Sequence, residues 1–272
     1  MRDPAVRENL VDTAPAQPFS GQCALITGGT SGIGLESAAQ LGEAGVSRVA
    51  INGRSAARGA EALAVLRRRC PQTEFVFLPG DVADWTTAQR IAAAVLDAFR
   101  RLDIFVGATG APHAPKLFHE TQAEEINPIL SGFLIPPLHM TRAVLPAMRA
   151  RKAGSIILVA SDAAKIATPG ESVIGAAMAG IVMFVRTLAM EAKRDGIRVN
   201  ALTPSIVADT QTHDRVMSAA FSGKLFAKAK AQAHLGVTLP ADQAALVVFL
   251  AGTGAARLTG QAISANGGIS AA

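Results

Sequence analysis

A chain of 272 residues in which 50% of the side chains are hydrophobic is long enough for one large core or two modest ones. Its two cysteines are too few for a disulfide framework, which indicates a reduced, cytoplasmic protein. The formal net charge of +5 comes from basic residues scattered among acidic ones, and with only 4% aromatic residues this pattern disfavours a nucleic-acid-binding surface.

The N-terminal residues carry charge and proline where a secretory signal peptide needs an apolar core. No stretch of the sequence approaches the continuous apolar length of a membrane span, so no membrane partner is expected. Residues 1–20 contain three prolines and no clear periodicity, which predicts an N-terminal arm. Residues 21–272 alternate predicted strands and helices and are expected to form one domain.

An apolar run at residues 23–26 predicts a buried strand that leads through a glycine-rich turn into a helical pattern ending at Gly45. Such a turn brings unpaired backbone N–H groups and the positive end of a helix dipole to one point, which favours an anion such as a pyrophosphate. The turn residues expected to hold this anion are Gly28, Thr30, Ser31, Gly32, Ile33 and Gly34.

The spacing Thr-Gly-x-x-x-Gly-x-Gly at residues 27–34 differs from G-x-G-x-x-G and resembles the cofactor turn of the short-chain dehydrogenase/reductase family. The resemblance covers about residues 20–268 and implies a single-domain α/β fold, a Rossmann-type doubly wound parallel sheet flanked by helices. It also implies a nicotinamide dinucleotide and a small-molecule substrate. The alternative, an ordinary glycine-rich turn without a ligand, does not account for the family order of the later motifs.

A second strand is predicted at residues 48–51, and its end meets the adenosine ribose in a dinucleotide-binding fold. An acidic side chain there would bind the ribose 2′-hydroxyl, whereas an arginine would pair with a 2′-phosphate. Gly53 occupies the acidic position, and Arg54 and Ser55 follow it. This arrangement favours NADP over NAD as the cofactor. The alternative is that Arg54 only begins the helix expected at residues 55–69.

A third strand at residues 74–78 leads to Asp81 and Val82, which match an Asp-Val pair of the family. The resemblance implies that both residues contact the cofactor and that the Asp81 carboxylate accepts a hydrogen bond from the adenine amino group. A helix is expected to follow at residues 86–101.

The fourth strand, predicted at residues 102–106, ends in the sequence Gly-Ala-Thr-Gly, where relatives usually carry Asn-Asn-Ala-Gly. Ala108 and Gly110 are expected beside the nicotinamide, in surroundings that this change has altered. The catalytic asparagine of the family has no secure counterpart, because counting along the chain from the two sides leads either to Asn127 or to Phe133.

A loop is predicted at residues 111–122, and relatives have a long helix after it. Here the consecutive residues Pro136 and Pro137 remove two helical N–H donors and hinder the turn before them. The helix is therefore expected to restart near Pro136.

The fifth strand, predicted at residues 155–161, ends at Ser161, where the family keeps its catalytic hydroxyl. The Tyr-x-x-x-Lys pair of the family would fall on Ile174 and Met178, and the chain contains no tyrosine at all. In the usual mechanism the lysine lowers the pKa of the tyrosine, which exchanges a proton with the substrate oxygen while hydride moves. Reduction of a ketone by that route is not expected here.

A sixth strand at residues 198–204 ends in Pro204, and the resemblance implies that Ile206 and Val207 lie against the nicotinamide carboxamide. The polar segment at about residues 205–236 is typical of a substrate lid.

A last helix at residues 242–250 and a last strand at residues 258–264 are expected to close the sheet. The sequence Asn-Gly-Gly at residues 266–268 also resembles the family, whose C-terminal strands commonly pack in dimers and tetramers. The resemblance therefore implies a homo-oligomer.

Three functions fit these motifs. The preferred one is an NADP-dependent reductase of an imine, an iminium or an activated C=C bond, none of which needs the missing tyrosine. In it Ser161 and Asp162 are the catalytic candidates, with Asp162 stabilising a cationic iminium or acting as the acid. The alternative for Asp162 is a turn or cap residue after the strand. Weaker candidates are Lys165, His113 and His139.

The second possible function is a catalytically silent NADP-binding subunit of a hetero-oligomer whose active copy is another chain. The third is a non-redox lyase or cyclase in which the nucleotide is structural. The reductase is preferred because Ser161, the lid and the nicotinamide-side strand remain recognisable. No metal site is predicted.

Overall fold

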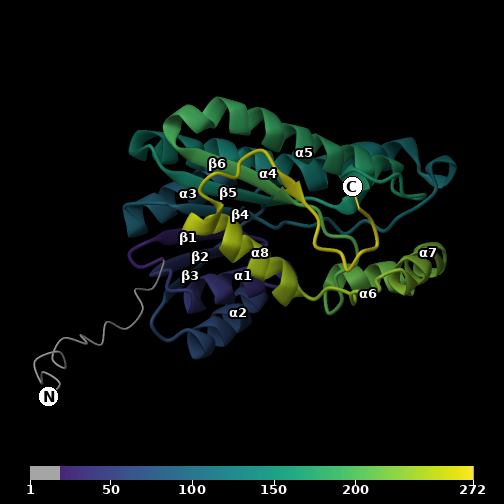
Figure 1. The fold of residues 1–272 in the computed structure, drawn as a ribbon, viewed down its shortest axis with the longest axis horizontal. Coiled ribbons are helices and arrows are strands. Elements are labelled where there is room, and N and C mark those ends of the chain that lie inside the picture. The colour runs from purple at the N-terminus through teal and green to yellow at the C-terminus, as the bar shows by residue number, and fades with distance from the viewer. Residues whose placement is uncertain (1–18, 272) are drawn as a thin grey trace, which may run out of the picture.

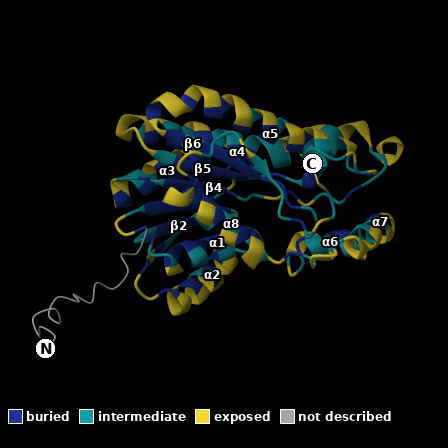
Figure 2. Ribbon diagram, in the orientation of Figure 1, coloured by how far each residue is buried: buried dark blue, intermediate teal, exposed yellow. Residues whose placement is uncertain are grey.

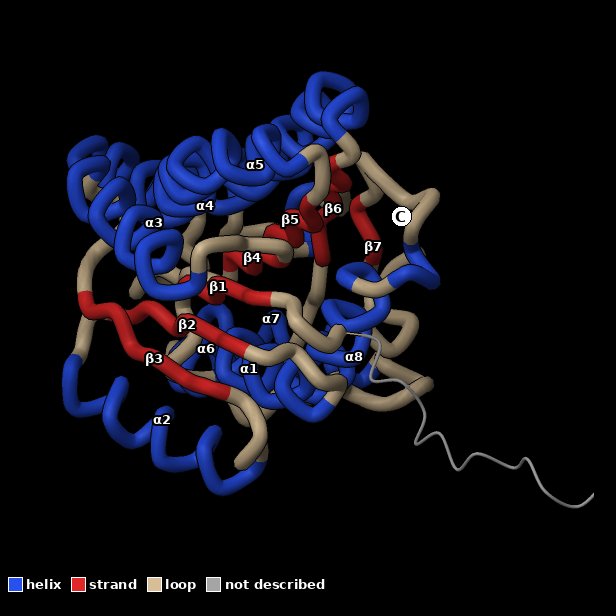
Figure 3. Tube along the Cα trace, turned by 90° about the vertical axis from the view of Figure 1, so that its left-hand side faces the viewer, coloured by secondary structure: helices blue, strands red, loops and turns tan. Residues whose placement is uncertain are grey.

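Seven parallel strands form one sheet in the order β3-β2-β1-β4-β5-β6-β7 in the computed structural model, which describes residues 19–271 (Figure 1). Helices cover both faces, with α1, α2 and α8 on one side and α3, α4 and α5 on the other (Figure 3). This arrangement confirms the predicted single-domain, doubly wound Rossmann-type fold. The strands are Cys23–Thr27 (β1), Arg48–Gly53 (β2), Glu74–Pro79 (β3), Ile104–Gly107 (β4), Gly154–Val159 (β5), Ile197–Leu202 (β6) and Ala262–Ile263 (β7).

The helices begin and end within a few residues of the predicted positions where the sequence is strongly periodic. They are Gly32–Glu43 (α1), Ala56–Arg69 (α2), Trp85–Phe99 (α3), Ala123–Arg151 (α4), Ser172–Ala192 (α5), Gln211–Ser218 (α6), Ala220–Ala231 (α7) and Pro240–Ala251 (α8). Short 3₁₀ helices lie at Phe118–Glu120, Asp162–Ala164, Lys193–Asp195 and Thr253–Ala255. The last strand is much shorter than expected, because residues 258–260 approach β6 irregularly, for example through Gly260 N–H donating to Val199 O.

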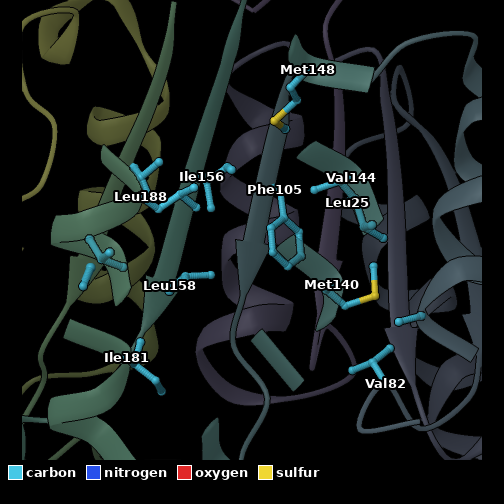
Figure 4. Packing of buried hydrophobic residues seen from close by; sticks show 14 of the residues in the cluster. Leu25, Val82, Phe105, Met140, Val144, Met148, Ile156, Leu158, Ile181 and Leu188 are labelled. Carbon is cyan, nitrogen blue, oxygen red and sulfur yellow. The ribbon is translucent and has the colours of Figure 1, made fainter. Parts of the chain in front are cut away.

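The alternation of side chains along the strands divides the core into two clusters, one on each face of the sheet. Figure 2 shows that the strands between the two helix layers are mostly buried. In β1, Leu25 packs in the cluster that contains Phe105 and Met140, whereas Ala24 and Ile26 belong to the opposite cluster. Figure 4 shows Phe105 of β4 beside Met140 of α4. Burial of each such large side chain stabilises the fold by roughly 1.5–3 kcal/mol.

Helix α4 runs without interruption from Ala123 to Arg151, so the expected restart near Pro136 is wrong. Four prolines lie inside it, and Pro136 and Pro137 are both buried. Pro137 lies close to Gly107 of β4, which places this stretch of the helix against the sheet. The prolines remove helical hydrogen bonds, but their apolar contact with the sheet offsets this loss. Burial of apolar side chains stabilises the fold by more than one or two helical hydrogen bonds do.

Helix α5 corrects a second expectation. The span Ser172–Asp195 has 24 residues and a mean hydropathy of 2.0, so by length and composition alone it could cross a membrane. In the structure 44% of its apolar window is buried, and Ile181 and Val185 pack into the core cluster beside the sheet. A core helix of a folded domain passes the same test, because its inward face must be apolar.

The predicted N-terminal arm lies outside the described residues up to residue 18. Its last part is described, and Phe19 is a core residue that is 2% exposed and packs in the cluster containing Val247 and Leu250 of α8. The domain therefore begins at or before Phe19, because burial of an aromatic ring anchors the chain there.

Substitution Phe105→Ala should lower the free energy of unfolding by about 3–5 kcal/mol, because it opens a cavity among side chains that are fully buried. Phe118→Ala is the matched control, since Phe118 is 58% exposed and its loss should change stability by no more than about 0.5 kcal/mol. Urea unfolding of both variants measures the difference. Equal effects of the two substitutions would contradict the placement of Phe105 in the core.

Candidate functional site

A cavity of about 480 Å³ opens at the carboxyl ends of β1, β2, β4 and β5, the edge at which parallel α/β sheets bind ligands. The sheet register pairs Thr27 with both Asn52 and Gly107, so the turn after β1 lies between the ends of two neighbouring strands. Residues predicted to bind the cofactor that line this cavity are Gly28, Thr30, Ser31, Gly32, Ile33, Arg54, Asp81, Val82, Ala108, Gly110, Pro204, Ile206 and Val207.

The glycine turn is a site of very close backbone approach. Gly28 has φ +70°, and a Cβ atom on it would lie 2.3 Å from the carbonyl oxygen of Ala108. A Cβ atom on Gly34 would lie 2.3 Å from the carbonyl oxygen of Gly28, so Gly34 packs helix α1 onto the turn and does not line the cavity. No side chain caps the start of α1 at Ser31. The N–H groups there suit an anionic ligand such as a pyrophosphate.

The end of β2 forms a basic corner of the cavity. The guanidinium of Arg54 lies 3.7 Å from the Asp81 carboxylate, and Arg58 donates a hydrogen bond to Gln211 Oε1 at 3.0 Å. A Cβ atom on Gly53 would lie 2.7 Å from Thr30 Cγ2, which leaves little room for the acidic side chain of an NAD site. Arg58 was not predicted, although it stands one helical turn after Arg54.

Ser55 is not part of the cavity wall. Its hydroxyl oxygen accepts a hydrogen bond from the backbone N–H of Arg58 at 3.4 Å and caps helix α2. The side chain therefore positions the first turn of α2 and with it the guanidinium of Arg58.

The opposite end of the cavity is largely apolar. Three residues on one face of α4 line it, namely Pro128, Gly132 and Pro136, and Ile174 and Met178 of α5 face the same space. Of the two asparagine alternatives on α4, Phe133 lines the cavity, whereas Asn127 is exposed and does not.

Ser161 lies at this apolar end. Its oxygen accepts a hydrogen bond from Ala163 N–H at 3.2 Å, which leaves the hydroxyl proton available for a further acceptor.

Asp162 lies outside the cavity lining, and its side chain is directed at the C-terminal segment. Its carboxylate accepts hydrogen bonds from the hydroxyl of Ser270 at 2.6 Å, from the amide of Asn266 at 3.4 Å and from the hydroxyl of Ser264 at 3.5 Å. Lys165 donates to Ser264 Oγ at 2.6 Å, and burial lowers the pKa of its ammonium. The two residues thus tie the end of the chain to β5, and this geometry favours the turn role over the catalytic one.

The histidine candidates differ in position. His113 lines the cavity from the loop after β4, whereas His139 packs edge-on against Trp85 with ring centroids 5.5 Å apart. A third histidine, His213 of α6, also lines the cavity and was not predicted. Its Nε2 atom is buried and has no hydrogen-bond partner among the described residues, so a ligand atom would satisfy it.

Glu171 is the acidic side chain at the apolar end of the cavity, and the sequence analysis missed it. Burial and, secondarily, the negative charge of Asp162 raise the pKa of its carboxyl to about 7. Glu171, Ile174 and Met178 stand at helical spacing of three and seven, so they share one side of α5. That spacing was the sequence signal that could have placed Glu171 at the cavity. The raised pKa, which marks it as a functional candidate, depends on the surrounding fold.

Comparison with known proteins agrees with this geometry. A family model described as short chain dehydrogenase matches residues 22–220. The chain belongs to the short-chain dehydrogenase family.

Among relatives of this short-chain dehydrogenase, a putative ketoacyl reductase of monensin polyketide synthase from Streptomyces virginiae is 32% identical, with 92% of this chain and 97% of the relative covered. Levodione reductase has a TM-score of 0.87 and 24% identity, covering 92% of this chain and 98% of its own. YwfH, an NADPH-dependent reductase involved in bacilysin biosynthesis, has a TM-score of 0.84 and 22% identity, covering 92% and 99%.

The glycines whose Cβ atoms would fill the turn, together with its uncapped helix start, fit the nicotinamide dinucleotide that the family binds. The predicted lid consists of α6 and α7, and Thr210 at the start of α6 approaches Gly32 of the turn. Helix α6 therefore lies beside the glycine turn and also lines the cavity.

Substitution Glu171→Gln should change how stability depends on pH. The folded carboxyl has a pKa of about 7 against an ordinary value of 4.5, so between these values the folded state binds more protons than the unfolded chain. The wild-type free energy of unfolding should therefore fall, relative to the variant, by at most about 1.4 kcal/mol per pH unit as the pH rises through this window. Urea unfolding at about pH 5 and about pH 8 measures it. Parallel pH profiles for the two proteins would refute the raised pKa of this carboxyl.

Proposed function

We propose that this chain is an NADP-dependent reductase with a non-standard active site, which transfers hydride to an imine, an iminium or an activated C=C bond. The observation that carries the proposal is one continuous cavity. It joins the glycine turn and the basic corner to a substrate end lined by Ile174 and Met178, the two positions on which the family's proton-transfer pair is expected to fall from the sequence.

The glycine turn, the basic corner and Asp81 would each bind a different part of the cofactor. Backbone N–H groups of the glycine turn would hold the pyrophosphate, and Arg54 with Arg58 would pair with a 2′-phosphate. Asp81 would accept from the adenine amino group, as the family resemblance implies. The description of YwfH as NADPH-dependent agrees with this cofactor preference. The bound nicotinamide would supply the hydride.

The apolar substrate end suits hydride acceptors that, unlike a ketone, need no proton donor during hydride transfer. Neither Ile174 nor Met178 can donate a proton or stabilise an alkoxide, so the ordinary route to an alcohol has no donor at those positions. An iminium becomes neutral when it takes up hydride, and a conjugated alkene can receive its proton afterwards at carbon. The Ser161 hydroxyl would orient the acceptor by donating a hydrogen bond.

The test uses the purified chain alone. Binding of NADPH and NADH is measured first, and the loss of NADPH absorbance is then followed with panels of ketones, imines and enoyl compounds. Turnover with the imine or enoyl panel and none with ketones is the expected result. Binding without turnover, restored only by a second short-chain dehydrogenase subunit, would replace the proposal with the silent-subunit alternative.

Removal of the basic corner should weaken NADPH binding selectively. Arg54→Ala and Arg58→Ala should each reduce the affinity for NADPH about 10-fold to 100-fold, because each removes a charge-assisted contact with the 2′-phosphate. The affinity for NADH should stay nearly constant. Arg68→Ala is a matched control on the same helix, since Arg68 is exposed and does not line the cavity. Calorimetric titration measures all four proteins, and an equal loss for both cofactors would refute the assignment.

We also infer that the chain forms a homo-oligomer, a dimer or a tetramer, in a reducing cytoplasmic setting. Two large apolar side chains on the outer face of α5, Met183 and Met190, are 58% and 60% exposed, and a partner copy would cover this surface. The free, buried thiols of Cys23 and Cys70 support the reducing setting. Light scattering of the purified chain determines the assembly.

A further inference from the structure

Glu171 is held firmly at the mouth of the substrate end. The carbonyl of the preceding residue, Gly170, accepts a hydrogen bond from Lys116 N–H at 2.8 Å, and Glu171 N–H donates to Thr168 O at 3.0 Å. Gly170 has φ +86° and packs so closely on Phe221 of α7 that a Cβ atom there would lie 2.6 Å from the ring. Contacts with the loop after β4, with Thr168 and with α7 therefore fix the backbone from which the Glu171 side chain projects.

The carboxyl of Glu171 has no structural task among the described residues. It stands at the N-cap position of α5, yet no side-chain hydrogen bond caps that helix. Only burial and the charge of Asp162 act on its protonation, with no hydrogen bond contributing. A half-buried carboxyl group that lines an apolar cavity and makes no side-chain hydrogen bond among the described residues is a candidate for work on a ligand.

We propose that Glu171 is the proton donor of this site and that its substrate is a neutral imine, which it converts to an iminium on the imine nitrogen. The inference rests on the proposed function, because the hydride still comes from the nicotinamide. It differs from the family's tyrosine mechanism in residue, in position on α5 and in the atom that receives the proton.

The step balances as follows. The O–H bond of the Glu171 carboxyl breaks and an N–H bond forms, which leaves a carboxylate beside a cationic C=N group. A bound NADPH would supply the hydride to the carbon of that group and become NADP⁺, and a neutral amine would result. The carboxylate recovers its proton from water. An imine nitrogen is basic enough to accept a whole proton from a carboxyl that titrates near neutrality, whereas a ketone oxygen is not.

The charge that acts on the protonation of Glu171 is negative. Asp162 acts on Glu171 with a negative charge, and its neighbour Lys165 donates away from the cavity to Ser264. The other ionisable groups that line this part of the cavity are His113 from the loop and His213 and Arg215 from α6, and Arg215 donates to Ala111 O at 3.5 Å. A carboxylate formed in a desolvated wall stabilises an adjacent iminium more strongly than one in water.

The experiment compares two substrates that differ only in their need for a proton. A phenyl-substituted cyclic imine requires protonation, and its N-methyl iminium salt carries the positive charge already. Glu171→Gln should lower kcat for the imine by at least about 100-fold but should keep the single-turnover rate with the iminium within about 10-fold. Glu171→Asp should recover part of the imine rate. Glu124→Gln, an exposed site on α4 outside the cavity, should behave as wild type.

A second measurement needs neither NADPH nor turnover. The cyclic secondary amine that matches the imine is titrated into the cofactor-free protein by calorimetry, at about pH 6 and about pH 8. The protonated amine should bind wild type more tightly at the higher pH, because Glu171 is then ionised, and this gain should vanish in Glu171→Gln. Affinity that is the same in both proteins at both values would overturn the proposal.

The outcomes separate the two proposals. Reduction of the imine by Glu171→Gln at the wild-type rate overturns the role of Glu171 and leaves the reductase intact. Failure of the wild type to oxidise NADPH with the imine, the iminium or any other panel overturns the proposed function, and the amine titration then still decides whether Glu171 receives a cation.

Discussion

The close approach of three backbone segments at the turn after β1 is the constraint on which the rest of the site depends. Gly28 touches the backbone at Ala108, and Gly34 touches the backbone at Gly28, with no room for a side chain at either position. These contacts draw the start of α1 against the ends of β1 and β4, where the strand order of the sheet reverses. The cavity exists there because helix α1 enters at that point and strand β4 ends beside it.

Desolvation determines the chemistry at the other end of this cavity. Ile174 and Met178 of α5 line this end, and apolar side chains make the wall less able to solvate charge than polar ones would. Burial and the negative charge of Asp162 also raise the pKa of the Glu171 carboxyl to about 7. An apolar wall therefore favours the neutral form of a carboxyl group that lies beside it.

Tertiary packing overrides local preferences in α4 and α5, the two long helices that cover one face of the sheet. Helix α4 tolerates four prolines, and Pro136 and Pro137 are buried in it, with Pro137 close to Gly107 of β4, without breaking the helix. Helix α5 is apolar enough to resemble a membrane span, yet its inward face packs in the core cluster. In both cases the apolar area buried against the sheet contributes more than the local propensity does.

The sequence by itself determined the order of strands and helices, the glycine turn and the basic residue Arg54, because each depends on neighbours a few positions away. Only the tertiary structure revealed that Arg58 meets Gln211, that Asp162 binds Ser270 and that partial burial raises the pKa of Glu171. The first two contacts join residues 153 and 108 positions apart. Periodicity and motif spacing describe short segments, whereas the protonation and reach of a side chain depend on whatever distant segments the fold packs around it.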